Sequence, residues 1–301
     1  MPVIAYFGPQ GTFTEQAARG LIPDGEFLPA ETIFAALNAV RDGRAEAACV
    51  PVENSVEGPV NATLDGLTES TVLVAVAETI LPVQFSVLVR QDASDIRTVA
   101  SHPHALAQVR QWLATNLPEA EQVPTSSTAA AAQAVRRGEY DAAVTASVAA
   151  QHYELREFVG GIADLADAST RFLLVRRPGR LPEPTGADRT SLMAVTVNRT
   201  GALAELLTEL SFRGINLTRL DARPAKTHIG QYRFFVDMEG HIAEPRIGDA
   251  VAALRRRCSV RFLGSHPRAD HAPSSGEPPV GNEDFVAATN WLESVRRGES
   301  V

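Results

Sequence analysis

The sequence is poor in cysteine and has no long apolar run, and each absence limits what the protein can be. Its two cysteines, Cys49 and Cys258, are too few for a disulfide framework or a thiolate metal site. No run of about 18 apolar residues is present to span a bilayer. Residues 1–8 also lack the basic segment and apolar stretch of a secretory signal. These absences predict a soluble, cytoplasmic protein.

An excess of basic residues is missing as well. The 301 residues include 28 Lys and Arg against 36 Asp and Glu, which gives a formal net charge of −8. This balance argues against nucleic acid or an anionic membrane as the main partner. At roughly 150 residues per domain, the chain is long enough for about two domains, each with a core of its own.

The first 180 or so residues alternate short strands with helices, as is typical of an α/β fold. Thr12 and Glu15 have the spacing of a capping box, which predicts a helix start after the first strand. Pro103 suits the first turn of a helix that carries Val109 and Leu113 on its apolar face. Further helices are predicted at 32–41 and 127–137, and strands at 3–7, 47–52, 71–80, 84–89, 98–100, 142–145 and 172–175.

One short pattern occurs twice. An alanine-rich helix that ends at Gly43 is echoed by one that ends at Gly138, and a strand of small residues follows each. We interpret the echo as two similar α/β lobes with a cleft between them. Clefts between lobes are common sites for small ligands.

A second unit follows a linker rich in proline and glycine at 176–187. Strands are predicted at 191–197, 215–223, 231–239 and 259–263, with helices at 202–213 and 245–256. The order βαββαβ is that of the ferredoxin-like split βαβ fold. The tail from Ser265 on is polar, apart from an amphipathic segment at 285–295 that either docks on a neighbour or forms only weakly.

Four stretches of the first unit resemble the prephenate dehydratase family, in the family's order. They are residues 8–14 (GPQGTFT), 50–58 (VPVENSVEG), 101–108 (SHPHALAQ) and 170–172 (TRF). Residues 201–203 (GAL) and 220–224 (LDARP) resemble the amino-acid-binding ACT domain that is fused to this enzyme. We see no chorismate mutase segment before the first motif.

The resemblance covers about residues 1–264 and implies an α/β architecture. A two-lobed catalytic domain of the type II periplasmic-binding-protein-like fold is expected at 1–180, a ferredoxin-like βαββαβ ACT regulatory domain at 188–264, and a polar tail at 265–301. The implied reaction belongs to L-phenylalanine biosynthesis. In it, prephenate loses its ring carboxylate as CO₂ and its ring hydroxyl as water, and phenylpyruvate remains. Aromatisation drives the reaction, so no metal or redox cofactor is expected.

By resemblance, the Thr170 hydroxyl donates to the departing ring hydroxyl. Full proton donation conflicts with the very high pKa of threonine, so we favour a hydrogen bond that strengthens in the transition state. Arg171 is interpreted as a carboxylate clamp, or else as a solvated residue at a strand edge. Glu53 is either a general acid with a raised pKa or an acceptor that orients neighbouring backbone or Arg171.

Four neutral polar residues match other cleft positions of the family, namely Asn54, Ser55, Ser101 and Gln108. The alternative is that they only cap helices and turns. The turn at Gly11 and Thr12 either offers backbone donors to a carboxylate or only begins a helix. His102 is interpreted as a helix-start residue and not as a metal ligand. The predicted catalytic residues are therefore Thr170, Asn54, Ser101, Gln108 and Glu53, and the predicted substrate-binding residues are Arg171, Phe172, Ser55, Thr12 and Gly11.

The second unit has no catalytic constellation, and the resemblance implies that it binds L-phenylalanine as an inhibitor. The predicted effector residues are Gly201, Ala202, Leu203, Asn216 and Leu217. The family has Glu-Ser where this chain has Asp221-Ala222, which leaves the identity and affinity of the effector open. An exposed sheet edge predicts a homodimer or homotetramer. Two alternatives stay open: arogenate dehydratase activity, and a non-catalytic amino-acid-binding protein.

Overall fold

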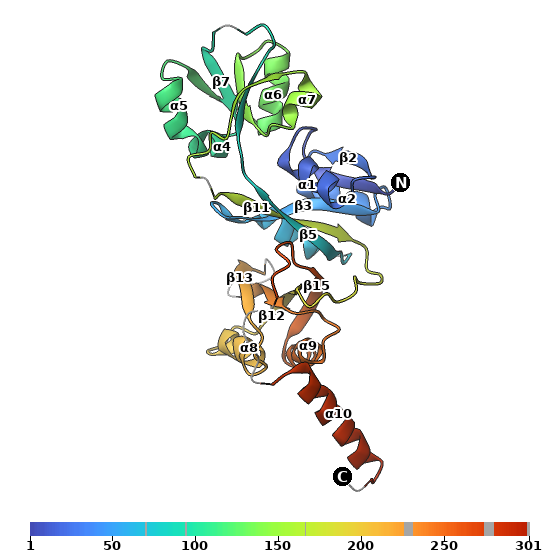
Figure 1. The fold of residues 1–301 in the computed structure, drawn as a ribbon. Coiled ribbons are helices and arrows are strands. Elements are labelled where there is room, and N and C mark those ends of the chain that lie inside the picture. The colour runs from blue at the N-terminus through green and yellow to red at the C-terminus, as the bar shows by residue number, and fades with distance from the viewer. Residues whose placement is uncertain (70, 94, 166, 226–230, 274–279, 300–301) are drawn as a thin grey trace. The chain divides into compact units, whose positions relative to one another are not determined.

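The computed structural model describes residues 1–69, 71–93, 95–165, 167–225, 231–273 and 280–299 (Figure 1). It divides into two compact units. Unit 1 comprises Met1–Gly66 and Thr79–Arg177, and unit 2 comprises Leu67–Glu78 and Pro178–Val301. Within the described ranges, every helix falls short of the length or apolar character that a bilayer span requires.

The first lobe of unit 1 is built on a mixed sheet with the strand order β11-β3-β1-β2. The central strand β1 is parallel to β2 and β3, whereas β11 is antiparallel to β3. Thr12 and Thr32 cap the first two helices through their side chains, as the sequence predicted for Thr12. The elements are β1 (Val3–Phe7), α1 (Phe13–Leu21), β2 (Glu26–Ala30), α2 (Ile33–Arg41), β3 (Ala47–Asn54), β4 (Gly58–Pro59), α3 (Asn61–Leu67) and β11 (Ser169–Arg176).

The second lobe of unit 1 has a five-stranded sheet with the order β10-β6-β9-β7-β8. Apolar clusters cover both faces of this sheet. Its helix α6 is capped by Ser127 and is followed by Gly138 at φ +80°, just as α2 is followed by Gly43 at φ +76°. The echo in the sequence therefore corresponds to two α/β lobes, as predicted. The elements are β6 (Ser86–Val89), β7 (Thr98–Ser101), α4 (Pro103–Gln108), α5 (Arg110–Asn116), β8 (Glu121–Pro124), α6 (Thr128–Arg136), β9 (Ala142–Thr145), α7 (Ala149–Tyr153) and β10 (Arg156–Gly160).

The single helix predicted from Pro103 to Leu113 is broken at Val109. Val109 has φ −123° and ψ 15°, and it separates α4 from α5. Asp164 explains the break, because its carboxylate accepts hydrogen bonds from the amides of Gln111 and Trp112 at 2.9 and 3.2 Å. A side chain from a distant loop thus caps the start of α5.

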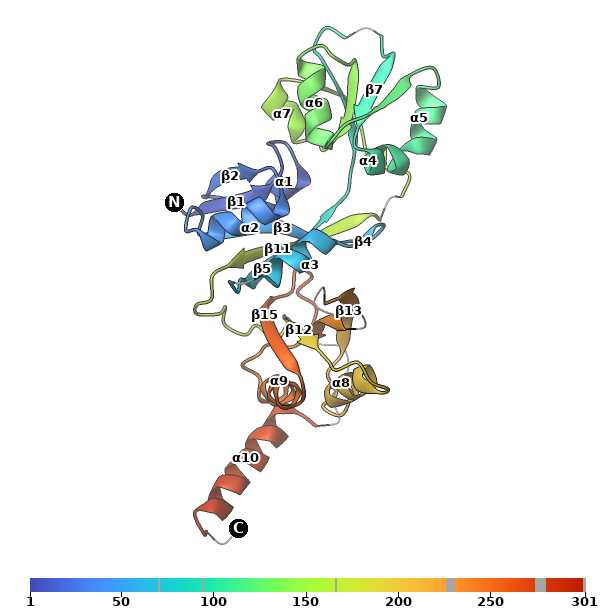
Figure 2. The ribbon, with the colours of Figure 1, turned by 180° about the vertical axis from the view of Figure 1, so that it is seen from behind.

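Unit 2 has the predicted βαββαβ order, with the sheet order β13-β14-β12-β15 and two helices on one face (Figure 2). Leucine, isoleucine and phenylalanine side chains between the helices and the sheet form its core. Strand β15 also pairs with the start of β5 (Val74–Pro82) and continues past the predicted end at Leu263. The other elements are β12 (Asp188–Val195), α8 (Ala202–Ser211), β13 (Leu217–Pro224), β14 (Tyr232–Glu239), α9 (Pro245–Arg257), β15 (Ser259–Pro267) and α10 (Asn282–Arg296).

Gly264 permits the close approach of β15 and β5. Its φ is +144°, and a Cβ at this position would lie 2.3 Å from the carbonyl oxygen of Ala75. We expect Gly264→Ala to destabilise the protein by about 3 kcal/mol or more, because a backbone clash adds to an unfavourable φ. Urea unfolding measures the loss. Gly20→Ala is the matched control: apart from its chain neighbours and its own helix backbone, no atom of the described residues lies within 4 Å of the added methyl group, and the variant should be neutral or stabilising. Equal midpoints for Gly264→Ala and the wild type would contradict the expectation.

We expect His266 to make the stability of unit 2 dependent on pH. It is fully buried beside Arg189, and burial lowers its pKa below the usual value of 6.5. The unfolded chain then binds the proton more readily than the folded chain, so stability should fall as the pH drops below about 6.5, by at most about 1.4 kcal/mol per pH unit. Unfolding midpoints between neutral and mildly acidic pH should fall less steeply for His266→Gln than for the wild type. Parallel curves would exclude His266 as the source.

Candidate active site

Asn54 and Thr170 lie opposite each other on the antiparallel strands β3 and β11. The Asn54 Nδ2 donates a hydrogen bond to the Thr170 Oγ1 at 2.8 Å. The Oδ1 of Asn54 accepts from the amides of Val56 and Glu57, both at 2.9 Å, so the orientation of the Asn54 amide is set. Because the Thr170 Oγ1 accepts this bond, its hydroxyl proton remains available for donation. No acceptor for that proton is found among the described residues. The structure thus places together the two residues that the motifs singled out.

Glu53 and Arg171 form the next pair along the same two strands. The Arg171 Nε and one terminal nitrogen lie 3.2 Å from the Glu53 Oε2. Only 7% of the Arg171 side chain is exposed, whereas that of Glu53 is partly exposed. The pairing register shifts between Arg171 and Phe172, a strand irregularity that re-aims neighbouring side chains. The ion pair fits the interpretation of Glu53 as an acceptor that orients Arg171.

Two predicted substrate-binding residues have structural contacts here. Phe172 is 2% exposed, so its ring is part of the core of the first lobe. The Ser55 amide donates to the Ser169 carbonyl, and the Ser169 amide donates to the Ser55 Oγ, both at 2.9 Å. This reciprocal pair extends the ladder between β3 and β11 and holds Asn54 and Thr170 in register.

The turn that contains Gly11 and Thr12 is closed by its own helix. The Gly11 amide donates to the Glu15 Oε2 at 2.6 Å, so this donor is occupied and is not open to a carboxylate of a substrate. The Thr12 Oγ1 accepts from the Glu15 amide at 3.3 Å and donates to the Phe7 carbonyl at 3.4 Å. In this structure the turn therefore caps α1, which is the simpler of its two interpretations.

Glu15 was predicted only as a capping residue, but it also contacts the second lobe of unit 1. Its side chain is fully buried and contacts Arg19 at 2.7 Å and the His152 Nε2 of α7 at 3.3 Å. Beside it, the Tyr153 hydroxyl donates to the Gln10 carbonyl at 2.7 Å. Burial, and secondarily the Glu15 charge, raise the pKa of Tyr153. No local pattern in the sequence marks α7 as the partner of α1.

Gly11 is required where α7 packs on this turn. Its φ is +84°, and an added Cβ would lie 3.1 Å from the Ala149 Cα. The residue is therefore needed for a close approach and a left-handed conformation, in addition to any role toward a ligand.

Ser101 lies just before α4 in the second lobe, and Gln108 is the last residue of α4. The Ser101 hydroxyl is fully buried and donates to the Val144 carbonyl. The Gln108 Oε1 is buried, and it finds no hydrogen-bond partner within the described ranges. An unpartnered buried amide oxygen is costly, so Gln108 is the better candidate for a ligand contact of the two.

The start of α4 meets the turn that follows Asn54. His102 caps α4, since its Nδ1 accepts from the His104 amide at 3.3 Å, as its interpretation as a helix-start residue predicted. Burial and the neighbouring His104 ring hold the pKa of His102 below its usual value. The His104 Nδ1 lies 3.3 Å from the Glu57 Oε2. Contacts therefore connect Thr170, through Asn54 and the 55–57 turn, to the second lobe.

The predicted effector residues lie in two places of unit 2. Gly201, at φ +83°, precedes α8 without a side-chain cap. Asn216 and Leu217 follow the other end of α8. Helix α8 has 10 residues and rises about 1.5 Å per residue, so its length alone separates Gly201 from Asn216 and Leu217 by about 15 Å. One copy of the chain does not bring them together.

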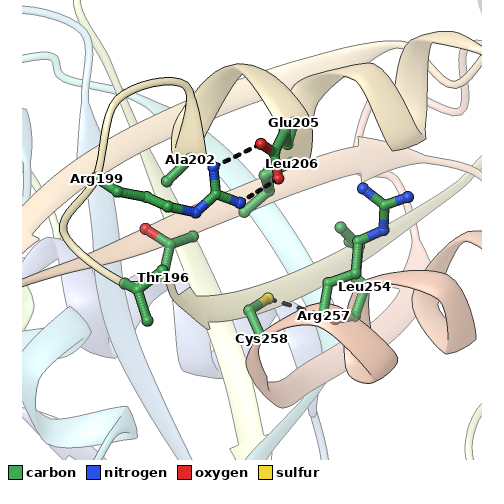
Figure 3. A pocket seen from close by; sticks show the side chains of 9 residues that line it. Thr196, Arg199, Ala202, Glu205, Leu206, Leu254, Arg257 and Cys258 are labelled. Atoms are coloured by element: carbon green, nitrogen blue, oxygen red, sulfur yellow. Dashed lines mark hydrogen bonds and ion pairs between the residues drawn. The ribbon is translucent and has the colours of Figure 1, made fainter.

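A pocket of about 300 Å³ lies between the start of α8 and the end of α9 (Figure 3). Arg199 and Glu205 face each other at its rim, joined by two hydrogen bonds of 2.7 and 2.6 Å. The Arg199 guanidinium holds the pKa of Glu205 below its usual range. Ala202 is the one predicted effector residue in its lining. Within the part of the chain that is described, no three His, Cys, Asp or Glu side chains are grouped to hold a metal ion.

Comparisons with known proteins agree with the motifs. The family model described as prephenate dehydratase matches residues 4–180. A prephenate dehydratase from Amycolatopsis methanolica is 65% identical over 304 residues, which cover 100% of both chains. The crystal structure of prephenate dehydratase in complex with L-Phe from Arthrobacter aurescens is 40% identical, with a TM-score of 0.91, and covers 98% of this chain and 99% of that one.

A further solved structure, GqqA, described as a novel type of quorum quenching acylase, is 32% identical with a TM-score of 0.81 and covers 91% of this chain and 98% of that one. The family model covers more than half of this chain, and the Amycolatopsis relative matches it from end to end. The chain therefore belongs to the prephenate dehydratase family.

Proposed function

We propose that unit 1 converts prephenate into phenylpyruvate, CO₂ and water, with Thr170 as the hydrogen-bond donor to the departing hydroxyl. The observation that carries this assignment is the contact from the Asn54 Nδ2 to the Thr170 Oγ1. A hydroxyl that accepts one hydrogen bond becomes a better donor for the next, because hydrogen bonds in a chain polarise one another. Asn54 thus aims and strengthens Thr170.

The reaction balances without an external electron acceptor. The bond between the ring and its carboxylate breaks, and its electron pair enters the ring as CO₂ departs. The bond from the ring to the hydroxyl breaks after this step or together with it, and the departing hydroxide takes up one proton from solvent to become water. A donor aimed at that oxygen stabilises the charge that develops on it.

Arg171 is proposed to bind a carboxylate of prephenate, and Glu53 to hold its guanidinium in place. A planar guanidinium suits a carboxylate because it offers paired donors in a fixed plane. Gln108 adds a neutral contact from the second lobe, where its amide oxygen is unpartnered among the described residues. Ser101, whose hydroxyl is used by the Val144 carbonyl, is assigned to holding β7 against β9.

Acyl transfer, the chemistry of the acylase GqqA, fits this geometry less well. A threonine nucleophile needs a base within hydrogen-bond reach to take its proton. The contact of the Thr170 hydroxyl is the Asn54 amide, which donates and does not accept at that point. The site is better suited to giving a hydrogen bond than to attacking a carbonyl carbon.

Unit 2 is proposed to bind L-phenylalanine and to inhibit unit 1. The relative from Arthrobacter aurescens was crystallised with L-Phe. Because α8 separates Gly201–Leu203 from Asn216 and Leu217, we propose that one copy supplies the first group and a second copy the other. Asp221, which replaces the family's glutamate, lies 3.4 Å from the Arg219 Nε on the same strand. A homodimer or homotetramer follows from this arrangement.

Turnover tests the proposed activity directly. Purified protein is incubated with prephenate, and separately with arogenate, and the aromatic product is followed by absorbance. We expect phenylpyruvate from prephenate. A folded protein that releases no phenylpyruvate would refute the assignment, and a higher kcat/KM with arogenate would change the substrate.

Calorimetry and the same assay with added L-phenylalanine test the regulatory proposal. We expect saturable binding and a lower rate. A full rate in the presence of L-phenylalanine, together with no heat of binding, would refute the effector proposal for unit 2 and leave the catalytic proposal for unit 1 standing.

A further inference from the structure

Helix α10 is held at its first residue, and none of its residues is buried. The Asn282 Oδ1 accepts from the Arg246 amide at 3.2 Å, and its Nδ2 donates to the Glu244 Oε2 at 3.0 Å. These bonds fix the start of α10 to the start of α9. Beyond them the helix runs away from α9 and from the sheet of unit 2 in both views (Figures 1 and 2).

An apolar stripe follows α10 from end to end. Its members recur at three- and four-residue intervals, which places them on one face of a helix. Trp291 is 56% exposed and Val295 43%, although both belong to this face. A lone 15-residue helix is marginal in water, so the stripe requires something to cover it. The stripe consists of Phe285, Ala288, Trp291, Leu292 and Val295.

The charges at the two ends of the stripe indicate which surface covers it. Asp284 lies in the first turn, four residues before Ala288 and on the same face. Arg296 lies in the last turn, four residues after Leu292. A second α10 that runs antiparallel sets each Asp284 opposite an Arg296, whereas a parallel partner would set like charges together. The same alignment sets Phe285 opposite Val295, and Ala288 opposite Leu292.

We propose that α10 pairs antiparallel with α10 of a second copy of this chain. The contact is self-complementary, as a twofold axis requires, because each residue pair occurs twice. A pair of four-turn helices buries less than the roughly 1,200–2,000 Å² of a standard interface. The pairing therefore adds one step of association to any other contact between copies, and it does not depend on the proposed catalytic function.

Leu292→Glu tests the stripe, with Val286→Glu as its matched control. The two residues are 40% and 46% exposed on the same helix, but Val286 lies off the stripe. Sedimentation equilibrium of the full chain should show that Leu292→Glu raises the concentration needed for the largest assembly by about tenfold or more. Val286→Glu should leave it unchanged. An unaltered assembly with Leu292→Glu, or an equal loss in both variants, would overturn the proposal.

Charge reversal tests the antiparallel alignment. Asp284→Arg and Arg296→Asp should each weaken the assembly, and the double variant should restore it. Asp284 also accepts from the Gly281 amide, so circular dichroism must show that helix content is kept. No restoration in the double variant would rule out the alignment.

Trp291 emission distinguishes a second copy from another part of the same chain. In a Trp112→Phe background, raising the concentration should shift the emission to the blue. Emission that is shielded in samples that sedimentation shows to be monomeric would mean that the chain covers its own stripe, and would refute the proposal.

Discussion

Replacing Thr170 by alanine should lower kcat by about 10²- to 10³-fold, because one preorganised donor to a developing oxyanion is worth that much. The fold should persist. Thr170 is 9% exposed at the start of β11, and its described hydrogen bond is the one that it accepts from Asn54. Steady-state rates with prephenate measure kcat and KM, and urea unfolding of the same samples measures stability.

Two further variants distinguish the effect of the Thr170 hydroxyl from the effect of the side-chain volume. Thr170→Ser keeps the donor and should retain activity within about tenfold of the wild type. Thr170→Val keeps the volume and should be as poor as the alanine variant. If Thr170→Val were as active as Thr170→Ser, the hydroxyl would have no part in the reaction.

Asn54→Ala should lose less activity than Thr170→Ala, because it removes the residue that aims the donor and not the donor itself. The double variant should be no worse than Thr170→Ala alone, since residues that act as a unit have non-additive effects. Additive losses would mean that Asn54 acts on the substrate independently.

The local parts of the fold could be predicted from the sequence. Side-chain caps at Thr12 and Ser127 were predicted as helix starts, because their chemistry depends only on residues three positions away. The βαββαβ order of unit 2 followed from apolar periodicity. Strands β2, β8 and β10 were missed because each lies at a sheet edge and has no buried residue, so its sequence lacks the longer apolar run of a buried strand.

Contacts between distant segments could not be predicted. The break at Val109 depends on Asp164, and the burial of Glu15 depends on His152. Nothing within a few residues of these positions records the partner. For the site, the motifs supplied Asn54 and Thr170, but only the pairing of β3 with β11 shows that one donates to the other.

The net charge of −8 opposes the binding of an anionic substrate, and the site must overcome it locally. Arg171 is the cation that the motifs place beside Thr170. Its guanidinium is nearly buried, where a charge interacts more strongly than at the surface. Glu53 orients that guanidinium but also adds a negative charge. Arg171 should therefore favour binding of the anionic substrate, and the charge of Glu53 should oppose it.

Arg171→Leu should therefore raise the KM for prephenate by about 10- to 100-fold, the range expected when a hydrogen bond to a charged group is lost. The variant leaves Glu53 without this partner beside an anionic substrate, so part of the rise reflects repulsion. The double variant Glu53→Gln, Arg171→Leu should recover that part. Arg171→Lys, which keeps the charge but not the planar fork, should lie between the wild type and Arg171→Leu. Arg176→Leu is the matched control, because Arg176 lies at the far end of the same strand β11 and should leave the KM unchanged. A fall in kcat and in the unfolding midpoint with the KM unchanged would mean that Arg171 only supports the strand pair and does not bind the substrate.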